Sequence, residues 1–252
     1  MKASSKAKEA ILAYGIMGSG KSHGWGEIAR YYRMRGAPGT FYVVGTEHEA
    51  LARMADKYPA TEADPGWDTN IVTNDVTDWI TLVATTNKYL SELKDGDWFV
   101  MEGLGLAWEW VRQLYVETRP GWTPPNPLDP FSVDPEVDMD WQKIKTAYYG
   151  WVQSILTSPA HVYATAHAEP LRVEGRWKDS KEAIDLYSRV GMRAITEKTA
   201  GYSFHSVLYM QHPKAKEWTI TTVDDHAREH LTDEPISDFV LSWLVPVAGW
   251  SL

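Results

Sequence analysis

The chain has 252 residues, of which 44% are hydrophobic and 23% charged, a balance typical of a globular protein built around one large domain. It contains no cysteine, which excludes a disulfide framework and a cysteine-ligated zinc site. The net charge of −9 excludes a uniformly basic surface, so any nucleic-acid site must be a local cationic patch.

The first part of the chain alternates short apolar runs with segments of helical spacing. Glycine and proline residues punctuate these segments, and Gly36 and Pro38 end the first helical one. The pattern predicts strands at 10–14, 40–47 and 70–74, helices at 21–35, 47–57 and 76–93, and a loop at 59–68.

The same alternation continues to about residue 167 and then changes character. It predicts strands at 98–102 and 161–167, helices at 104–117 and 141–157, a proline- and acid-rich loop at 118–140, and a polar, mobile run at 168–185. From about residue 190 only strands follow, at 192–198, 205–212 and 217–223, and the last two flank the tight turn 213–216 as a hairpin.

The order of these elements predicts a single α/β domain spanning residues 1–252. Strands alternating with helices imply a mostly parallel, twisted sheet flanked by helices. We expect a core at about 8–190, followed by an antiparallel hairpin extension and tail at about 191–252.

The longest apolar stretch is 240–252, which is too short to span a bilayer and contains Pro246. It either packs on the core as the last element or docks on a neighbouring subunit. The charged first nine residues are not typical of a secretory signal. We therefore expect no membrane association and a cytoplasmic location, in the host cytoplasm if the protein is viral.

The segment from Gly15 to Ser22, "GIMGSGKS", fits the phosphate-loop (Walker A) pattern G-x-x-x-x-G-K-[ST] at every fixed position. Glycines let successive backbone N–H groups turn inward toward phosphate oxygens, and the following helix adds the positive end of its dipole. Lys21 is expected to reach the β- and γ-phosphates of ATP, and the Ser22 hydroxyl to ligate Mg²⁺.

The residues expected to contact the nucleotide are Gly15, Met17, Gly18, Ser19, Gly20, Lys21, Ser22 and His23. Two further glycines, Gly24 and Gly26, lie inside the predicted helix, where each costs about 1 kcal/mol relative to alanine. Close packing of the helix on the sheet would explain them.

Nucleotide hydrolysis also needs carboxylates at strand ends. Glu102 follows the apolar run 98–101 and can hold Mg²⁺ through water, although aspartate is commoner there; alternatively, it is a strand-end glutamate facing solvent. Many phosphate-loop ATPases place a glutamate directly after the metal carboxylate, but here that residue is Gly103. Glu47, at the end of the predicted strand 40–47, is then the candidate base.

At these residues the chain resembles the RecA/RadA-type recombinase ATPases, in which a catalytic glutamate stands in a context like "TEHEAL". The order of phosphate loop, glutamate strand, "WFVMEGLGLAW" and "HVYATAH" is similar too, and the run "DWQKIKTAYYGWVQSILTSPAHVYATAHAEP" resembles short phage-type RecA cores associated with single-strand annealing and recombination. The likeness covers about residues 8–230, and only its phosphate loop is strongly specific.

The resemblance implies a role for each matching residue. Lys21 would be a catalytic residue that binds the phosphates, Glu47 would activate water, and Glu102 would associate with Mg²⁺. Thr165 or His167, close to the end of the strand at 161–167, would sense the γ-phosphate; the alternative for His167 is a neutral, inert histidine at a strand end.

The resemblance further implies a homo-oligomer, either a ring or a filament, that acts on single-stranded DNA. The loop 118–140 departs from the family because it is acidic. The segment 168–185 offers cations beside an aromatic ring, which suits a single strand, but its acids more than cancel their charge and a solvated loop is the alternative. The candidate DNA contacts are Arg172, Arg176, Trp177 and Lys178.

In RecA-like proteins a cation from the neighbouring subunit often completes the site. The candidates here are Lys214, Lys216 and Arg228, although the hairpin turn that holds the two lysines can equally be a simple exposed turn.

The leading interpretation is a Mg²⁺-dependent ATPase acting on single-stranded DNA in phage-type recombination or strand annealing. One alternative is a small-molecule or nucleotide kinase whose lid, 168–185, clamps phosphates with Arg172 and Arg176. Another is a motor ATPase driven by a protein partner.

Overall fold

The computed structural model describes residues 8–46, 55–62, 64–118, 141–214, 217–226 and 233–245. Its centre is a nine-stranded sheet. The strands are β1 (Ala10–Gly15), β2 (Phe41–Gly45), β3 (Ile71–Asp75), β4 (Trp98–Met101), β5 (His161–Pro170), β6 (Met192–Ala194), β7 (Ser206–Lys214), β8 (Glu217–Asp225) and β9 (Asp233–Ile236).

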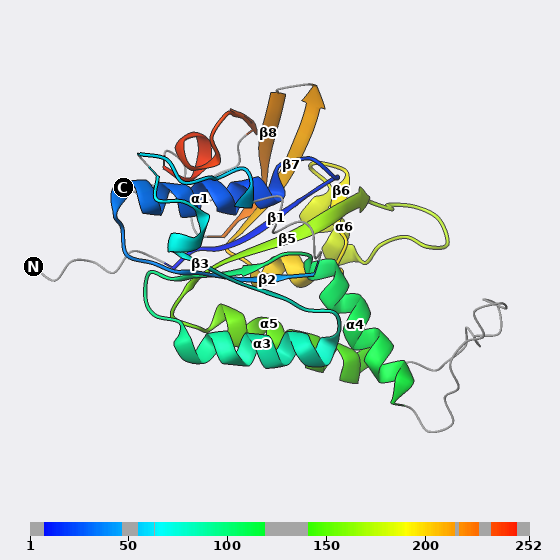
Figure 1. The fold of residues 1–252 in the computed structure, drawn as a ribbon. Helices are drawn as coiled ribbons and strands as arrows, with labels where there is room; N and C mark the ends of the chain where they lie inside the picture. The colour runs from blue at the N-terminus through cyan, green and yellow to red at the C-terminus, as the bar shows by residue number, and fades with distance from the viewer. Residues whose placement is uncertain are drawn as a thin grey trace, which may run out of the picture.

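Helices cover both faces of this sheet (Figure 1). The α-helices are α1 (Lys21–Arg35), α3 (Trp79–Glu92), α4 (Leu104–Glu117), α5 (Trp141–Leu156) and α6 (Lys181–Tyr187). Two short 3₁₀ helices are η1 (Trp67–Thr69) and η2 (Ala200–Ser203), and η3 (Val240–Leu244) is a short π-helix.

The strand order is β3-β2-β4-β5-β1-β7-β8-β9, with β6 paired to the end of β5. Neighbours from β3 through β7 run parallel, whereas β8 and β9 add antiparallel pairs at one edge. The predicted fold class, a mostly parallel α/β sheet with an antiparallel hairpin extension, is therefore confirmed.

Strand β1 is buried on both faces, as expected for the interior of a parallel sheet. Leu12 and Tyr14 point into the core that α3, α4 and α5 complete, while Ile11 and Ala13 point into the core beneath α1. Figure 1 shows these helices on opposite sides of the sheet, with the phosphate-loop segment at the edge where the parallel strands end. This arrangement brings the ends of β1, β4 and β5 together.

Helix α1 has the bounds that the sequence predicts. Gly36 ends it in a left-handed conformation at φ 60°, and its backbone N–H caps the carbonyls of the last turn. A Cβ atom on Gly24 would lie 2.4 Å from the Tyr163 hydroxyl oxygen. A glycine inside the helix thus lets α1 pack directly on β5, as expected.

Several predicted boundaries were wrong. Helix α3 begins at Trp79 rather than at residue 76 because Asp78 and Thr81 form a capping box. Strand β5 continues to Pro170, where its last residues pair with β6, and Ser180 caps helix α6. The segment 168–185 is therefore not one polar loop; only its middle, 171–178, is a projecting loop.

The C-terminal part of the chain differs from the prediction in one strand and agrees with it in the packing of the last described residues. Strand β9 was not predicted, and it pairs with β8. Phe239, Trp243 and Leu244 are buried, and η3 contacts α1, so residues 239–245 pack on the core. Residues 246–252, and most of the helix predicted at 47–57, lie outside the described residues. Of the helices in the described ranges, none has the length and apolarity needed to cross a bilayer.

Candidate functional site

The phosphate loop joins the end of β1 to the start of α1. The Lys21 ammonium group donates hydrogen bonds to the carbonyl oxygens of Gly15 and Ile16, at 3.0 and 2.9 Å. Gly18 and Gly20 adopt positive φ angles of 75° and 92°, which disfavour any residue with a side chain. The sequence thus folds here into a bare backbone turn with one cation held against it.

A hollow of about 460 Å³ lies beside this loop. Its size is within the range of about 300–1,000 Å³ typical of small-molecule sites. The residues that line it are Gly18, Gly20, Lys21, Ser22, His23, Lys57 and Trp218. Because α1 begins at Lys21, the positive end of its dipole lies at this hollow, which favours an anion there.

Glu102, directly after β4, lies beneath the start of α1 and is only 7% exposed. Its Oε2 accepts hydrogen bonds from the Ser22 hydroxyl at 3.1 Å and from the Thr165 hydroxyl at 2.7 Å. Its Oε1 accepts one from the indole N–H of Trp25. The structure therefore joins the two residues expected to serve Mg²⁺ and does not place Glu102 in solvent.

Burial raises the pKa of Glu102, because desolvation disfavours the charged form. The hydrogen bonds from Thr165, Trp25 and Ser22, and the charge of Lys21, act in the opposite direction. The site thus holds a costly buried carboxylate whose hydrogen-bond partners all favour its ionised form.

The turn after Glu102 explains an unexpected feature of the sequence. Gly103 has a φ of 85°, and a Cβ atom there would lie 2.1 Å from the Thr46 hydroxyl oxygen. The Gly103 N–H donates to the Thr165 hydroxyl at 3.0 Å, and the Thr46 hydroxyl donates to the Glu102 carbonyl at 3.0 Å. The glutamate that many phosphate-loop ATPases carry at this position has no room here.

The oxygen atoms of Ser22 and Glu102 fit a Mg²⁺ ion, which prefers oxygen ligands. Within the described ranges, no cluster of three or more His, Asp or Glu side chains could hold a metal on its own.

Thr165 and His167 differ in their surroundings. The Thr165 side chain is buried against Glu102 and Gly103, whereas His167 is exposed and pairs in register with Gly15 of β1. Of the two, only His167 is solvent-exposed, and it lies level with Gly15 at the start of the phosphate loop.

The candidate DNA and trans-acting residues are solvent-facing where the structure describes them. On the projecting loop 171–178, Trp177 is 70% exposed and the Arg176 guanidinium lies 5.1 Å from its ring centre. The Arg172 guanidinium nitrogen lies 4.0 Å from a carboxylate oxygen of Glu169, and Lys178 is exposed. In the hairpin, the Lys214 ammonium nitrogen lies 3.5 Å from a carboxylate oxygen of Glu217. Glu47, Lys216 and Arg228 lie outside the described residues.

Sequence reasoning missed Trp25 and Trp218. Trp218 of β8 stacks on His212 of β7, with ring centres 4.5 Å apart and planes within 3°, and its indole flanks Gly20. No local pattern marks either tryptophan, because one depends on the helical face and the other on hairpin register. Their proximity to the phosphate loop could be found only from the fold.

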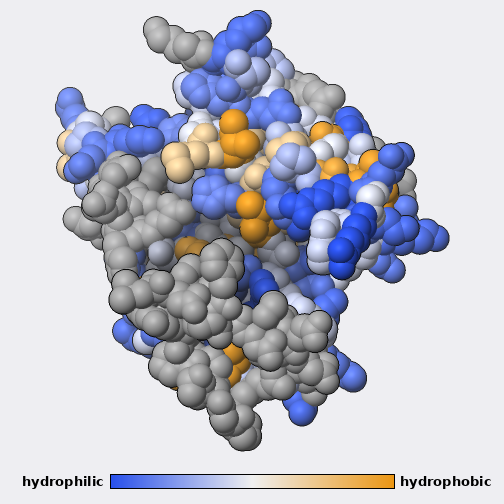
Figure 2. Space-filling model, turned by 90° about the vertical axis from the view of Figure 1, so that its right-hand side faces the viewer, coloured by the Kyte–Doolittle hydropathy of each residue, from blue (hydrophilic) through white to orange (hydrophobic). Residues whose placement is uncertain are grey.

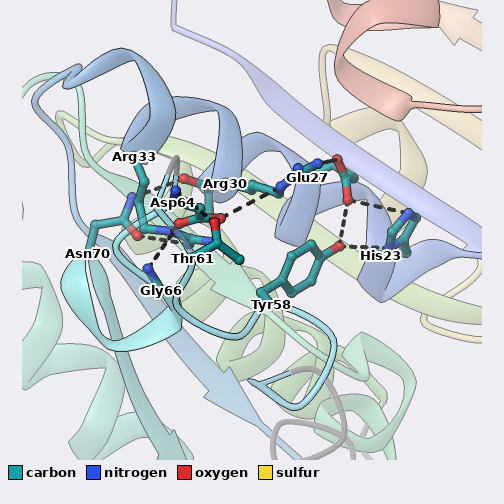
Figure 3. A network of polar contacts seen from close by, with 10 residues as sticks. His23, Glu27, Arg30, Arg33, Tyr58, Thr61, Asp64, Gly66 and Asn70 are labelled. Atoms are coloured by element: carbon teal, nitrogen blue, oxygen red, sulfur yellow. Dashed lines mark hydrogen bonds and ion pairs between the residues drawn. The ribbon is translucent and has the colours of Figure 1, made fainter.

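A polar network joins α1 to the segment before β3 (Figure 3). The Tyr58 hydroxyl lies 2.7 Å from the His23 Nδ1 atom and donates to Glu27 at 2.9 Å. Deeper in, the Arg33 guanidinium makes two hydrogen bonds to Asp64, at 2.8 and 3.1 Å. Burial lowers the pKa of His23. The network holds His23, which lines the hollow beside the phosphate loop.

No protein-family profile matches the chain, and no curated protein sequence matches it. Among solved structures, the KaiC-like protein PH0186 from the hyperthermophilic archaeon Pyrococcus horikoshii OT3 is similar, with a TM-score of 0.50 at 12% sequence identity. The match covers 90% of this chain and 84% of that one. At this identity the likeness concerns the fold alone: the chain shares the mostly parallel α/β fold of this KaiC-like protein.

Proposed function

We propose that the chain is a Mg²⁺-dependent ATPase of the RecA-like type. The observation that supports the proposal is the Ser22–Glu102 hydrogen bond beside the Lys21 loop, since it joins the glycine-rich loop to a buried carboxylate. A glycine-rich turn with no ligand would not require a buried carboxylate at this point, because burying one is costly.

Each residue of the site has a proposed task. Lys21 and the amides of the loop would bind the β- and γ-phosphates, and Ser22, with Glu102 through water, would hold Mg²⁺. When bound, the ion would supply charge neutralisation and polarisation at the γ-phosphoryl group.

Glu47 is proposed to activate the attacking water. It follows Thr46 in the sequence, and the Thr46 hydroxyl donates a hydrogen bond to the Glu102 carbonyl. His167 is proposed to sense the γ-phosphate from β5, where it pairs in register with Gly15. Thr165 is better suited to holding Glu102.

We further propose a homo-oligomer, either a ring or a filament, that acts on single-stranded DNA in phage-type recombination or annealing. Figure 2 shows hydrophobic residues among hydrophilic ones on the face where the parallel strands end. Ile16 and Met17 of the phosphate loop are 51% and 84% exposed, so their apolar side chains are available to a second subunit. Lys214, Lys216 and Arg228 are the candidate trans-acting cations.

The projecting loop is the proposed DNA contact. Arg172, Arg176 and Lys178 can neutralise a backbone, and Trp177 offers a face on which bases stack. The same two arginines would clamp phosphates in a kinase, so the experiment must separate the two functions.

ATP turnover, measured with and without single-stranded DNA, tests this proposal together with the mass of the protein in a non-hydrolysable ATP analogue. We expect DNA to stimulate turnover and the analogue to drive assembly. Trp177→Ala should weaken DNA binding roughly 5- to 150-fold, the loss of one stacked base, whereas Tyr202→Ala, which removes another exposed aromatic residue, should not.

Other outcomes would count against parts of the proposal. A monomer that transfers phosphate only to a small acceptor would identify a kinase. Turnover that responds to a protein partner but not to DNA would identify a motor. Absence of any ATP turnover would refute the ATPase.

A further inference from the structure

The two oxygens of Glu102 have different partners. Oε2 lies beside Ser22 and Thr165, whereas Oε1 accepts the indole N–H of Trp25. Trp25 lies three residues after Ser22, so both side chains leave the same face of α1. One helix thus supplies the hydroxyl beside Oε2 and the donor that holds Oε1.

Trp25 is rigidly placed. Its side chain is fully buried, and its ring packs against Trp67, with ring centres 5.2 Å apart. An indole nitrogen can only donate a hydrogen bond, so it needs an acceptor when it is buried. In this fold the acceptor is the carboxylate of Glu102.

This contact offers a reason for glutamate in place of the commoner aspartate at residue 102. A glutamate has one more methylene group and one more rotatable bond, so its carboxylate reaches farther but has more orientations to lose. A donor on Oε1 removes that freedom. A shorter aspartate, starting from the same backbone, could not span Ser22 and Trp25 in the same way.

We propose that Trp25 is a positioning residue for metal binding: its N–H fixes Oε1 of Glu102, which keeps Oε2 beside Ser22 for a nucleotide-bound Mg²⁺. Glu102 and Trp25 then work as a pair in place of a lone aspartate. The inference rests on the proposed function, because it requires a nucleotide and its metal at Ser22.

The test is a calorimetric titration of ADP with and without Mg²⁺, which yields the enhancement of ADP affinity by the metal. Trp25→Phe keeps an aromatic ring in the core and removes the N–H. It should reduce the enhancement at least about tenfold, as expected for a lost hydrogen bond to a charged group, and should change metal-free ADP affinity less than about twofold.

The matched control is Trp67→Phe, which changes the neighbouring buried tryptophan but leaves Glu102 untouched; it should retain the wild-type enhancement. Glu102→Asp should lose the enhancement as Trp25→Phe does. In the double variant the two losses should not add, because each removes the same contact. Thermal melting of each variant verifies folding, and Glu102→Asp decides alone if Trp25→Phe fails to fold.

The proposal is overturned if folded Trp25→Phe or Glu102→Asp keeps the wild-type enhancement of ADP affinity by Mg²⁺. It is also overturned if the control Trp67→Phe loses as much of this enhancement as Trp25→Phe does. Wild-type protein that binds ADP without any effect of Mg²⁺ would overturn it as well. Wild-type protein that binds no ADP under either condition would instead refute the proposed function itself.

Discussion

Gly24 is a residue whose presence is explained by tertiary packing and not by the helix itself. Inside a helix it reads as a defect, yet the Tyr163 hydroxyl occupies the space of its missing side chain and donates to the Lys21 carbonyl at 3.0 Å. The glycine thus sets how closely the start of α1, and with it the phosphate loop, packs on β5.

Gly24→Ala should therefore destabilise the protein by about 1–3 kcal/mol, the usual effect of overpacking a core. Gly150→Ala is the matched control, because Gly150 also lies inside a helix but a Cβ atom there meets nothing within 4 Å. That change should stabilise by about 0.5–1 kcal/mol through helix propensity. Urea unfolding measures both, and equal effects of the two substitutions would refute this account of Gly24.

Some residues of the site could be predicted from the sequence, and others could not. The phosphate loop and Glu102 could be predicted, because fixed spacing and the end of an apolar run mark them. Trp25 and Trp218 could not, since nothing local tells which buried aromatic residue faces a strand end. Gly103 could be noticed only as a departure, and its reason, the nearby Thr46 hydroxyl, comes from the fold.

Both ends of helix α1 make buried polar contacts: Ser22 and Trp25 near its start bind Glu102, and Arg33 near its end binds Asp64. The Arg33 side chain is fully buried and pairs with Asp64, whose side chain is 6% exposed. Hydrogen bonds from Arg33 hold the pKa of Asp64 below its usual value, even though burial opposes them. The pair anchors the segment before β3, next to the hollow, to the helix.

Asp64→Asn should cost about 3 kcal/mol of unfolding free energy at pH 7, because the Arg33 charge stays buried without its counter-charge. Since the folded-state pKa of Asp64 is lowered, its contribution is present above the unfolded pKa of about 3.9 and is lost as pH falls through the folded value. The variant should therefore lose less stability than the wild type on acidification below about pH 4.

Glu109→Gln is the control for this comparison, because it breaks the half-exposed Glu109–Arg112 pair and should cost less than about 1 kcal/mol. Denaturant unfolding between acidic and neutral pH measures all three proteins. Parallel pH curves for the wild type and Asp64→Asn would contradict the role given to this pair.

Elements with a strong local signal were predicted well, and those that depend on distant partners were not. Strand β1 and helix α1 are bounded by glycines and an apolar run, so their positions follow from local sequence. The end of β5 is polar and becomes a strand only because β6 pairs with it, and β9 exists only beside β8. Such pairings have no local signature.

At the scale of the whole molecule, the chain order of the elements was enough to predict the sheet, but not which strands neighbour β1. The hairpin strand β7 pairs in parallel with β1, which brings Trp218 on β8 to the phosphate loop. The extension thus lines the hollow beside the phosphate loop and is not only an addition to the sheet.

The central claim is that the backbone amides of residues 15–22 and the Lys21 ammonium group bind a nucleoside triphosphate. Calorimetry of wild-type protein and Lys21→Ala with Mg²⁺-ATP tests it most directly. The account predicts one saturable site in the wild type and an affinity at least about tenfold lower in the variant, as expected when a charge-assisted contact to phosphate is lost. No binding heat in the wild type, or equal affinity in a folded variant, would contradict it.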